Sequence, residues 1–436
     1  MCRQRCCSAS SEVLDKPPRL VGMGGCCLDM LAQVAAFPEP DAKVRTERME
    51  THGGGNAANA LTSAARLGLV NPALITKIGN DSVGDQILAE LKDDGVDVAH
   101  VLRDPVAPSP FSYIIVDRER GTRTCVHTPS EPLAPEEMTH ERVEAALTGA
   151  SLVYFDGCLT EAALVVARAA RAKGIKVLVE AESLVPVDLG LNLEALLAEA
   201  DYVFTSARYP QECTGESCLA DALISLLGLL PRAEWMLTTL GTRGSVLLQR
   251  HKQGAEGCEE ARLTTVMDDL LAAAQGQAIS HQQPGCTSQS GIRIGAGAMK
   301  STEGPMKLLR SRPWGTQSSA AAKLAAATAA ATHADSNTAG FSSYQEEQAS
   351  PSAESTPSCC ASVTVACAAS IPQDAIQDTT GAGDAFLGAV LYSLCTGLQL
   401  AKAMRLAAVV AACKCTELGP RPGLPRRADL DPDMLQ

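Results

Sequence analysis

One segment of the sequence, Asp378-Thr-Thr-Gly381-Ala382-Gly383-Asp384-Ala-Phe386, spaces glycines and carboxylates as phosphate chemistry requires. It leads into an amphipathic stretch that predicts a helix. Two glycines at a helix start let backbone N–H groups approach one point, where the helix dipole adds positive charge, so Gly381, Ala382 and Gly383 could bind an anion. Asp384 would lie in the first turn and could be the base for a hydroxyl that attacks phosphorus. A capped helix start without a ligand explains the motif equally well.

A second glycine-rich helix start, Gly53-Gly54-Gly55-Asn56-Ala-Ala-Asn59, has residue types suited to a polyol. Gly54 and Gly55 permit close backbone approach, and the Asn59 amide can both donate and accept hydrogen bonds. Asp29 follows a predicted strand at 20–24, at the carboxyl edge where α/β sheets bind ligands, and its carboxylate could accept two hydroxyls. The alternatives without a ligand are cap glycines and a solvated loop acid.

Composition and motif spacing exclude several other function classes. A dinucleotide fingerprint would need a third glycine where Cys27 and Phe386 stand, and no Gly-x-x-x-x-Gly-Lys-Ser/Thr sequence occurs. With 37 Lys and Arg against 50 Asp and Glu, the chain has no positive field to attract nucleic acid. No apolar run reaches the ~18 residues that a membrane span needs. The 17 scattered cysteines lack the paired spacing of a zinc site.

Short β-branched runs alternate with amphipathic runs over most of the chain, which predicts repeated βαβ units and an α/β fold with a mostly parallel sheet. Strands are expected at 20–24, 73–78, 152–155, 176–179, 202–205, 235–239, 245–248 and 362–368. Helices are expected at 56–67, 83–94, 136–147, 161–173, 191–199, 219–230, 382–396 and 399–418. Segments 31–51 and 111–127 break the alternation and predict two strand pairs, which would form a small β-lid apart from the main sheet.

A change in composition divides the chain. Residues 252–361 are rich in Ala, Ser, Gln, Gly and Thr, which predicts a largely disordered insertion, with short helices at 263–274 and 320–331. Without it and a disordered tail at 1–18, about 308 residues remain, which suits one α/β domain made of 19–251 and 362–436. The tail has no secretory signal, so a cytoplasmic location is expected, with a plastid or other organelle as the alternative.

The motifs together resemble the PfkB or ribokinase-like carbohydrate kinases, from Leu20 to Pro425 with the insertion removed. Residues 378–386 are similar to the family's C-terminal signature and 54–68 to its N-terminal signature. Further similarity lies in three segments, Gly79-Asn-Asp-Ser-Val-Gly84, Thr239-Leu-Gly241-Thr-Arg-Gly244 and Gly419-Pro-Arg-Pro-Gly-Leu-Pro425. The resemblance implies a three-layer α/β/α sandwich with a mostly parallel central sheet and a β-lid, and transfer of the γ-phosphoryl group of ATP to a sugar hydroxyl.

The resemblance also implies roles for single residues. Asp384 would be the catalytic base, with Gly381, Ala382 and Gly383 as the anion hole for the migrating phosphoryl group. The implied sugar-binding residues are Asp29, Gly54, Gly55, Asn59 and, on the lid, Arg123. The implied ATP-binding residues are Thr239, Gly241, Gly244 and Ser206. Mg²⁺ would accompany ATP, a monovalent cation is a further candidate cofactor, and exposed lid strands could pair two subunits into a homodimer.

One segment departs from the family pattern. The family usually has Asn-x-x-Glu ahead of a Thr-Gly, a motif tied to its Mg²⁺ and phosphate network, whereas Ser206-Ala-Arg-Tyr209 precedes Thr214-Gly215 here. Tyrosine cannot replace a carboxylate at pH 7. Glu180 and Glu182 could supply the charge or could be surface acids. Two alternatives to a sugar kinase therefore stay open, a nucleoside kinase of the same fold and a non-catalytic binding protein that keeps the kinase fold.

Overall fold

A computed structural model describes most of the chain. Its described residues are 18–182, 192–230, 232–251, 259–275, 284–289, 291–309, 319–336 and 359–436. All but residue 18 of the predicted N-terminal tail, and much of the predicted insertion, lie outside them. None of the helices in the described part is long and apolar enough to span a bilayer.

The centre of the molecule is a large sheet in the order β13-β17-β18-β12-β11-β10-β9-β8-β1-β4-β5, with β16 also paired to β18. Three of its short members are β13 (Glu260–Arg262), β16 (Met299–Ser301) and β17 (Met306–Leu309). Strands β11, β10, β9, β8, β1, β4 and β5 are parallel neighbours, and β12 and β18 add antiparallel pairs. The bounds are β1 (Arg19–Met23), β4 (Ala73–Gly79), β5 (Val101–Asp104), β8 (Ala150–Phe155), β9 (Lys176–Ala181), β10 (Tyr202–Ser206), β11 (Trp235–Thr239), β12 (Ser245–Arg250) and β18 (Cys359–Ala366). The predicted α/β fold is confirmed.

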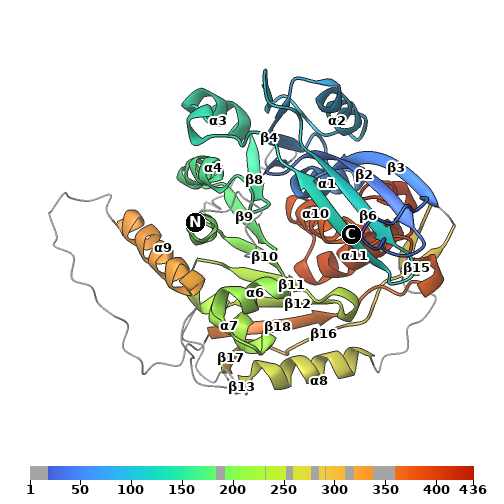
Figure 1. Cartoon of the computed structure of the whole chain (residues 1–436). Helices are drawn as coiled ribbons and strands as arrows, with labels where there is room; N and C mark the ends of the chain where they lie inside the picture. Colours follow the sequence, from blue (N-terminus) through green and yellow to red (C-terminus); the bar gives the residue numbers. More distant parts are fainter. Residues whose placement is uncertain are drawn as a thin grey trace, which may run out of the picture.

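Helices cover both faces of this sheet because successive residues of its strands point to opposite sides. Along β8, Leu152 and Tyr154 belong to one apolar core and Val153 and Phe155 to the other. The first core is covered by α1 (Asn56–Arg66), α2 (Ser82–Asp93), α10 (Ala382–Thr396) and α11 (Leu400–Lys414). The second is covered by α3 (His140–Leu147), α4 (Thr160–Ala172), α5 (Leu193–Ala198), α6 (Arg208–Thr214) and α7 (Leu219–Leu229). Figure 1 shows the resulting three layers.

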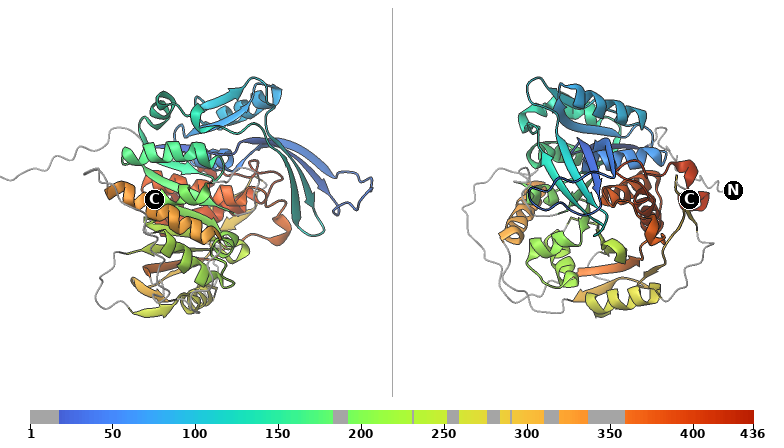
Figure 2. Two further views of the ribbon diagram at one scale, coloured as in Figure 1. Left: turned by 60° about the vertical axis from the view of Figure 1, so that its left-hand side comes forward. Right: turned by 45° about the vertical axis from the view of Figure 1, so that its right-hand side comes forward.

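The two predicted strand pairs form one separate sheet. Its order is β3-β2-β6-β7, with β2 (Cys27–Val34), β3 (Arg48–Gly54), β6 (Phe111–Asp117) and β7 (Thr122–Thr128). These strands project from the body of the molecule in Figure 2. On one face Leu31, Ile114 and Val116 pack against Leu418 from the body. This face of the lid is therefore turned toward the carboxyl edge of the main sheet.

The expectation of a largely disordered insertion does not hold for its described residues. They form β13 (Glu260–Arg262), α8 (Leu263–Gln275), β14 (Gly285–Thr287), β15 (Arg293–Gly295), β16 (Met299–Ser301), β17 (Met306–Leu309) and α9 (Ser319–Ser336). The two short predicted helices are confirmed as α8 and α9. Leu263, Leu308 and Leu324 are fully buried in the second core. Few apolar residues at the right spacing are enough to fold such a segment when a sheet edge and a core are already available.

Two local differences concern single helices. The helix expected at 136–147 is divided, because Thr139 caps α3 by accepting a hydrogen bond from the Arg142 N–H, and a short 3-10 turn precedes it. The helix expected at 399–418 ends at Lys414. Residues 415–419 then turn back toward the start of α10, so the Gly419 N–H reaches the Asp378 carboxylate.

Candidate functional site

The glycine turn before α10 opens onto free space. Gly381 has a left-handed backbone (φ 73°) and begins the helix by accepting a hydrogen bond from the Ala385 N–H at 2.9 Å. An ideal Cβ on Gly383 would meet no atom within 4 Å. Behind the turn, Asp378 Oδ1 accepts from the N–H and the hydroxyl of Thr380 at 2.9 and 2.7 Å. The first N–H groups of α10 thus border an open position, as anion binding requires.

Asp384 lies in the first turn of α10 and is 8% exposed. Its Oδ2 accepts a hydrogen bond from Asn59 Nδ2 at 2.8 Å. The pKa of the Asp384 carboxyl is raised to about 7, chiefly by burial and further by the charges of Glu182 and Asp156, while the Asn59 N–H lowers it. A carboxyl with a pKa near neutrality can take a proton from a hydroxyl and release it again.

Asn59 is held from its other side by Arg421. The Arg421 Nε donates to Asn59 Oδ1 at 2.9 Å, and its Nη2 donates to the Gly54 carbonyl at 3.1 Å. Arg421 is only 3% exposed, and its Nη1 has no hydrogen-bond partner among the described residues. The sequence interpretation missed Arg421, which lies in the segment Gly419–Pro425. The only signal was an arginine among glycines and prolines.

Asp29 is the third residue of lid strand β2, where it pairs with His52 of β3. It is 5% exposed and accepts a hydrogen bond from the Cys27 thiol at 3.3 Å, so the alternative of a solvated loop acid is wrong. Burial raises the pKa of the Asp29 carboxyl. An ideal Cβ on Gly54 would overlap this carboxylate, which explains the glycine there. Gly55, with φ 90°, caps α1 directly beside it.

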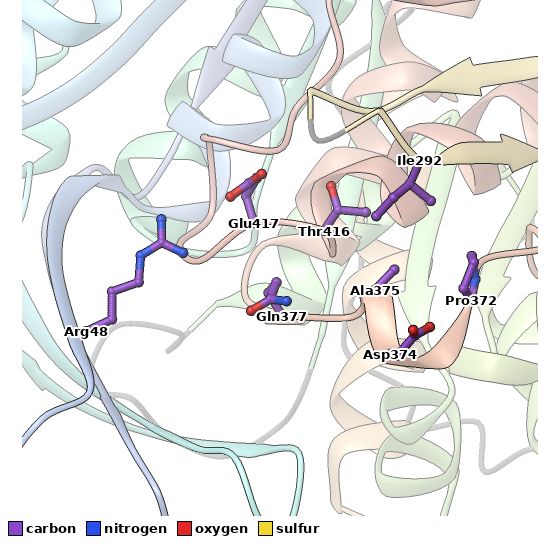
Figure 3. Close-up of a pocket in the computed structure, with 8 residues that line it drawn as sticks. All are labelled: Arg48, Ile292, Pro372, Asp374, Ala375, Gln377, Thr416 and Glu417. Carbon is purple, nitrogen blue, oxygen red and sulfur yellow. The ribbon is translucent and has the colours of Figure 1, made fainter.

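The lid also reaches the glycine turn. Arg123 of β7 is exposed and its Nη1 donates to the Thr379 hydroxyl at 3.0 Å. A cavity of about 350 Å³ lies between lid residues 116–122 and the segment 374–379. A neighbouring cavity of about 440 Å³ is shown in Figure 3, where Arg48 of the lid lies across from Thr416 and Glu417. The lid therefore stands over the outer side of the turn.

The residues expected to bind ATP lie at the carboxyl ends of adjacent strands. Ser206 ends β10 and Thr239 ends β11, and the two are register partners. Gly241 and Gly244 both have positive φ, 60° and 96°. An ideal Cβ on Gly244 would overlap the Ala366 carbonyl, so only glycine fits this turn. The structure therefore brings these four residues together.

Carboxylates from neighbouring strands share this edge. Glu180 of β9 is buried and accepts from the Tyr154 hydroxyl at 2.5 Å, and burial together with the charge of Asp384 raises the pKa of its carboxyl. Asp156, which the sequence interpretation missed, directly follows β8. It accepts hydrogen bonds from the N–H groups of Gly25, Ala57 and Cys158 at 2.6, 3.2 and 3.0 Å. An acid straight after a buried strand was the signal that could have identified it.

The segment that departs from the family pattern, residues 206–209, begins at the edge of the sheet and ends in the apolar core. The Ser206 hydroxyl lies at the edge and donates to the Glu182 carbonyl at 2.6 Å. Tyr209 is fully buried in the second core and lies away from the carboxylates. The Glu182 carboxylate accepts from Asn56 Nδ2 at 3.3 Å and is exposed at this edge. Glu182, and not Tyr209, thus presents its side chain at this edge.

The described residues hold no group of three His, Cys, Asp or Glu side chains arranged around a metal. Mg²⁺ is usually bound by one or two carboxylates together with substrate phosphates and water, and the carboxylates of Glu180 and Glu182 at this edge are donors of that kind. Glu182 and Glu180 are the acids that could take this part.

A comparison with known families decides the affiliation. The model of the family described as pfkB family carbohydrate kinase matches residues 18–268 and 355–427. The chain belongs to this family. This family membership places the chain among the transferases of the kinase class. The unmatched residues 269–354 of this pfkB chain lie inside the segment of biased composition.

Individual relatives agree with this affiliation. Fructokinase-1 of Oryza sativa subsp. japonica is 25% identical over 249 residues, which is 54% of this chain and 74% of that protein. A nucleoside kinase of Methanothermobacter thermautotrophicus is 27% identical over 102 residues, 23% of this chain. That alignment spans only 33% of the nucleoside kinase. The structure of Arabidopsis thaliana ribokinase complexed with ribose and ATP has a TM-score of 0.58 at 17% identity, covering 95% of this chain and 97% of that one. This likeness shows the fold.

Proposed function

We propose that this pfkB-family protein transfers the γ-phosphoryl group of ATP to a hydroxyl of a sugar or sugar-like ring. The observation that carries the proposal is the position of Asp384, a buried carboxyl with a raised pKa in the first turn of α10, beside the open position at Gly383. Asp384 takes the proton of the acceptor hydroxyl as its oxygen attacks the γ-phosphorus. The bond between that phosphorus and the bridging oxygen of ADP breaks as the new one forms.

The chain's own residues would bind both substrates around this base. Gly381, Ala382 and Gly383 present N–H groups to the migrating phosphoryl group, and their effect is largest in the transition state, where charge moves onto the transferred oxygens. Asp29, Asn59 and the backbone at Gly54 and Gly55 orient the acceptor's other hydroxyl groups. Closure of the lid through Arg123 excludes water, which would otherwise compete with the acceptor.

The nucleotide would occupy the carboxyl edge formed by β10, β11 and the turn after them. Ser206 and Thr239 offer hydroxyl groups there, while Gly241 and Gly244 let the backbone approach the ligand closely. Mg²⁺, when bound with ATP, neutralises the charge of the phosphates and lowers the barrier to transfer. Glu182, an exposed acid at this edge, would be the side chain that helps to hold the metal ion.

A coupled ADP-release assay on the full chain tests this proposal. The acceptor panel consists of ketoses, aldopentoses and nucleosides, each with MgATP, and Asp384→Asn is the matched control. We expect at least one sugar to give ADP release that disappears in the control. Release with nucleosides alone would favour the second candidate, a nucleoside kinase, which the partial likeness to the Methanothermobacter nucleoside kinase supports. MgATP binding without turnover of any acceptor would favour a non-catalytic binding protein.

A further inference from the structure

A fully buried lysine lies directly behind the glycine turn. Lys414 is the last residue of α11 and has an exposed fraction of 0%. Its Nζ donates to the Asp378 carbonyl at 2.6 Å and lies 3.9 Å from Asp378 Oδ2. Burial of an ammonium group is strongly unfavourable unless charge and hydrogen bonds compensate it. Packing alone therefore does not explain why a lysine occupies this buried position.

The partner of Lys414 is Asp378, whose carboxylate holds the glycine turn in place. Asp378 Oδ1 accepts both donors of Thr380, and its Oδ2 accepts from the Gly419 N–H at 2.9 Å. The next residue, Cys415, contributes its carbonyl, which accepts from the Gln377 and Asp378 N–H groups at 2.8 and 3.3 Å. Lys414 thus fixes the rear of the segment whose front is Gly381 to Gly383.

The charges facing the ammonium group come from several elements. Asp378 and Asp384 are the carboxylates that stabilise it, and the Cys415 thiol is the third acidic group beside it. The positive charge of Arg123, on the lid, disfavours the charged form of the ammonium group. Burial lowers the pKa of the Lys414 ammonium, and the nearby carboxylates raise it. A cation at the rear of the turn adds positive potential at the front, where a phosphoryl group would arrive.

We infer that Lys414 is the built-in cation of the anion-binding turn, a positioning residue that makes phosphoryl transfer independent of an added monovalent cation. A monovalent cation remains a candidate cofactor from the sequence resemblance, so the two possibilities make opposite predictions. The inference rests on the proposed kinase function. It assigns to this chain's own lysine the task of holding the turn and supplying its charge.

The first experiment measures turnover of the full-length wild type in potassium, sodium and tetramethylammonium chloride at equal ionic strength. We expect the three rates to agree within about twofold, because no site for a small cation needs filling. A rate that rises strongly with potassium and falls to background in tetramethylammonium would overturn the inference. This test needs no variant and therefore stands even if changes at Lys414 prevent folding.

The second experiment removes the charge. Lys414→Met keeps much of the side-chain volume, and we expect kcat to fall by about tenfold to a hundredfold, as for the loss of a charged hydrogen bond, with the acceptor KM little changed. Lys402→Met, at an exposed position of the same helix, is the control and should keep wild-type rates. In Lys414→Ala, added methylammonium or potassium should restore part of the lost rate. Unchanged turnover in Lys414→Met, or a loss that no cation restores in Lys414→Ala, would contradict the inference.

A third measurement separates this inference from the proposed function. Calorimetry gives the affinities for MgATP and MgADP without an acceptor. Because the turn would contact only the γ-phosphate, Lys414→Met should weaken MgATP binding by about tenfold and leave MgADP binding nearly unchanged. If the wild type turned over no acceptor, the kinase proposal would fail, and the ATP-to-ADP affinity ratio would still decide the role of Lys414. Equal ratios in wild type and variant would then overturn it.

Discussion

Asn59 and Asp384, 325 positions apart in the sequence, are joined by a hydrogen bond of 2.8 Å from Asn59 Nδ2 to Asp384 Oδ2. The other end of the same amide accepts from Arg421 Nε at 2.9 Å. A guanidinium can only donate and an ionised carboxylate can only accept, so the amide has one orientation that satisfies both neighbours. The N-termini of α1 and α10 are thereby tied together at the proposed site of chemistry.

Loss of Arg421 should disturb this orientation. In Arg421→Met the Asn59 carbonyl loses its donor, the amide can turn over, and the Asp384 carboxyl loses an N–H donor. We expect kcat/KM for the acceptor to fall at least about tenfold, in line with loss of a buried charged hydrogen bond, while KM for ATP stays near the wild-type value. Steady-state kinetics with each substrate varied separately will measure both. Arg427→Met, at the same terminal segment, is the control, and an equal loss there would point to a general weakening of the fold.

Asp384→Asn tests the base directly. A general base contributes about 10²–10⁴-fold, so turnover should fall by at least ~10²-fold. The Asn59 N–H can still bond to the new amide oxygen, and circular dichroism should show an intact fold. Near-normal turnover in this variant would remove Asp384 from the mechanism.

The raised pKa of Asp384 predicts the pH profile. Only the ionised carboxyl can accept a proton, so kcat/KM should rise with pH through an apparent pKa of about 7 and then level off. A pH–rate series on the free enzyme measures this acid limb, which Asp384→Asn should lack. If kcat/KM instead rose through about pH 4, the ordinary range for aspartate, the pKa of the Asp384 carboxyl would not be raised in the free enzyme.

The same shift affects stability. Because the folded-state pKa lies above the unfolded value, the carboxyl contributes stability below about pH 4 that is lost as the pH rises through 7. Asp384→Asn removes a buried charge, so at pH 8 its melting temperature should exceed that of the wild type, and at pH 5 the difference should shrink. Differential scanning fluorimetry at the two pH values measures the sign. A lower melting temperature at pH 8 would contradict the assigned shift.

The sequence was sufficient to predict the layers and the turn at Gly381–Gly383. Strands such as β8 are buried on both faces and read as β-branched and aromatic runs, and a glycine pair before a helix needs no long-range information. Arg421 could not be found this way, because its partner Asn59 lies 362 positions away and nothing local specifies that contact. Asp29 was predicted as a site residue, but its place inside a lid strand was not, because β2 pairs with β3 and with the distant β6.

Average composition is a poor guide to folding where a few apolar residues determine whether a segment packs. Averaged over 252–361, small polar residues predict disorder, yet Leu263, Leu308 and Leu324 bury completely against a core that other segments supply. Helix α6, a seven-residue helix that contains Pro210, was not predicted. Both errors have one physical origin, which is that tertiary contacts override local preference when the remaining core is already formed.

Gly383 offers a test of the anion hole with little risk to the fold. An ideal Cβ there meets no atom within 4 Å, and its backbone does not need positive φ, so Gly383→Val should fold normally. The added side chain would fill the position of the phosphoryl group and should abolish transfer, with Gly383→Ala intermediate. Gly304→Val, at an equally open glycine of the described residues, is the control. Retained activity in Gly383→Val would mean that this helix start is purely structural.

The outer face of the lid predicts a dimer. Tyr113, Val126 and Met49 are 50%, 55% and 61% exposed, and the strand register places all three on the face opposite Leu31 and Ile114. An apolar face on a small sheet is typical of an association surface, and a second copy could cover it through the same residues. We expect light scattering to show a dimer in the wild type and a monomer in Tyr113→Lys/Val126→Lys. Val70→Lys, which changes an equally exposed valine outside the lid, should leave the dimer intact. A wild type that is monomeric at all concentrations would exclude pairing through the lid.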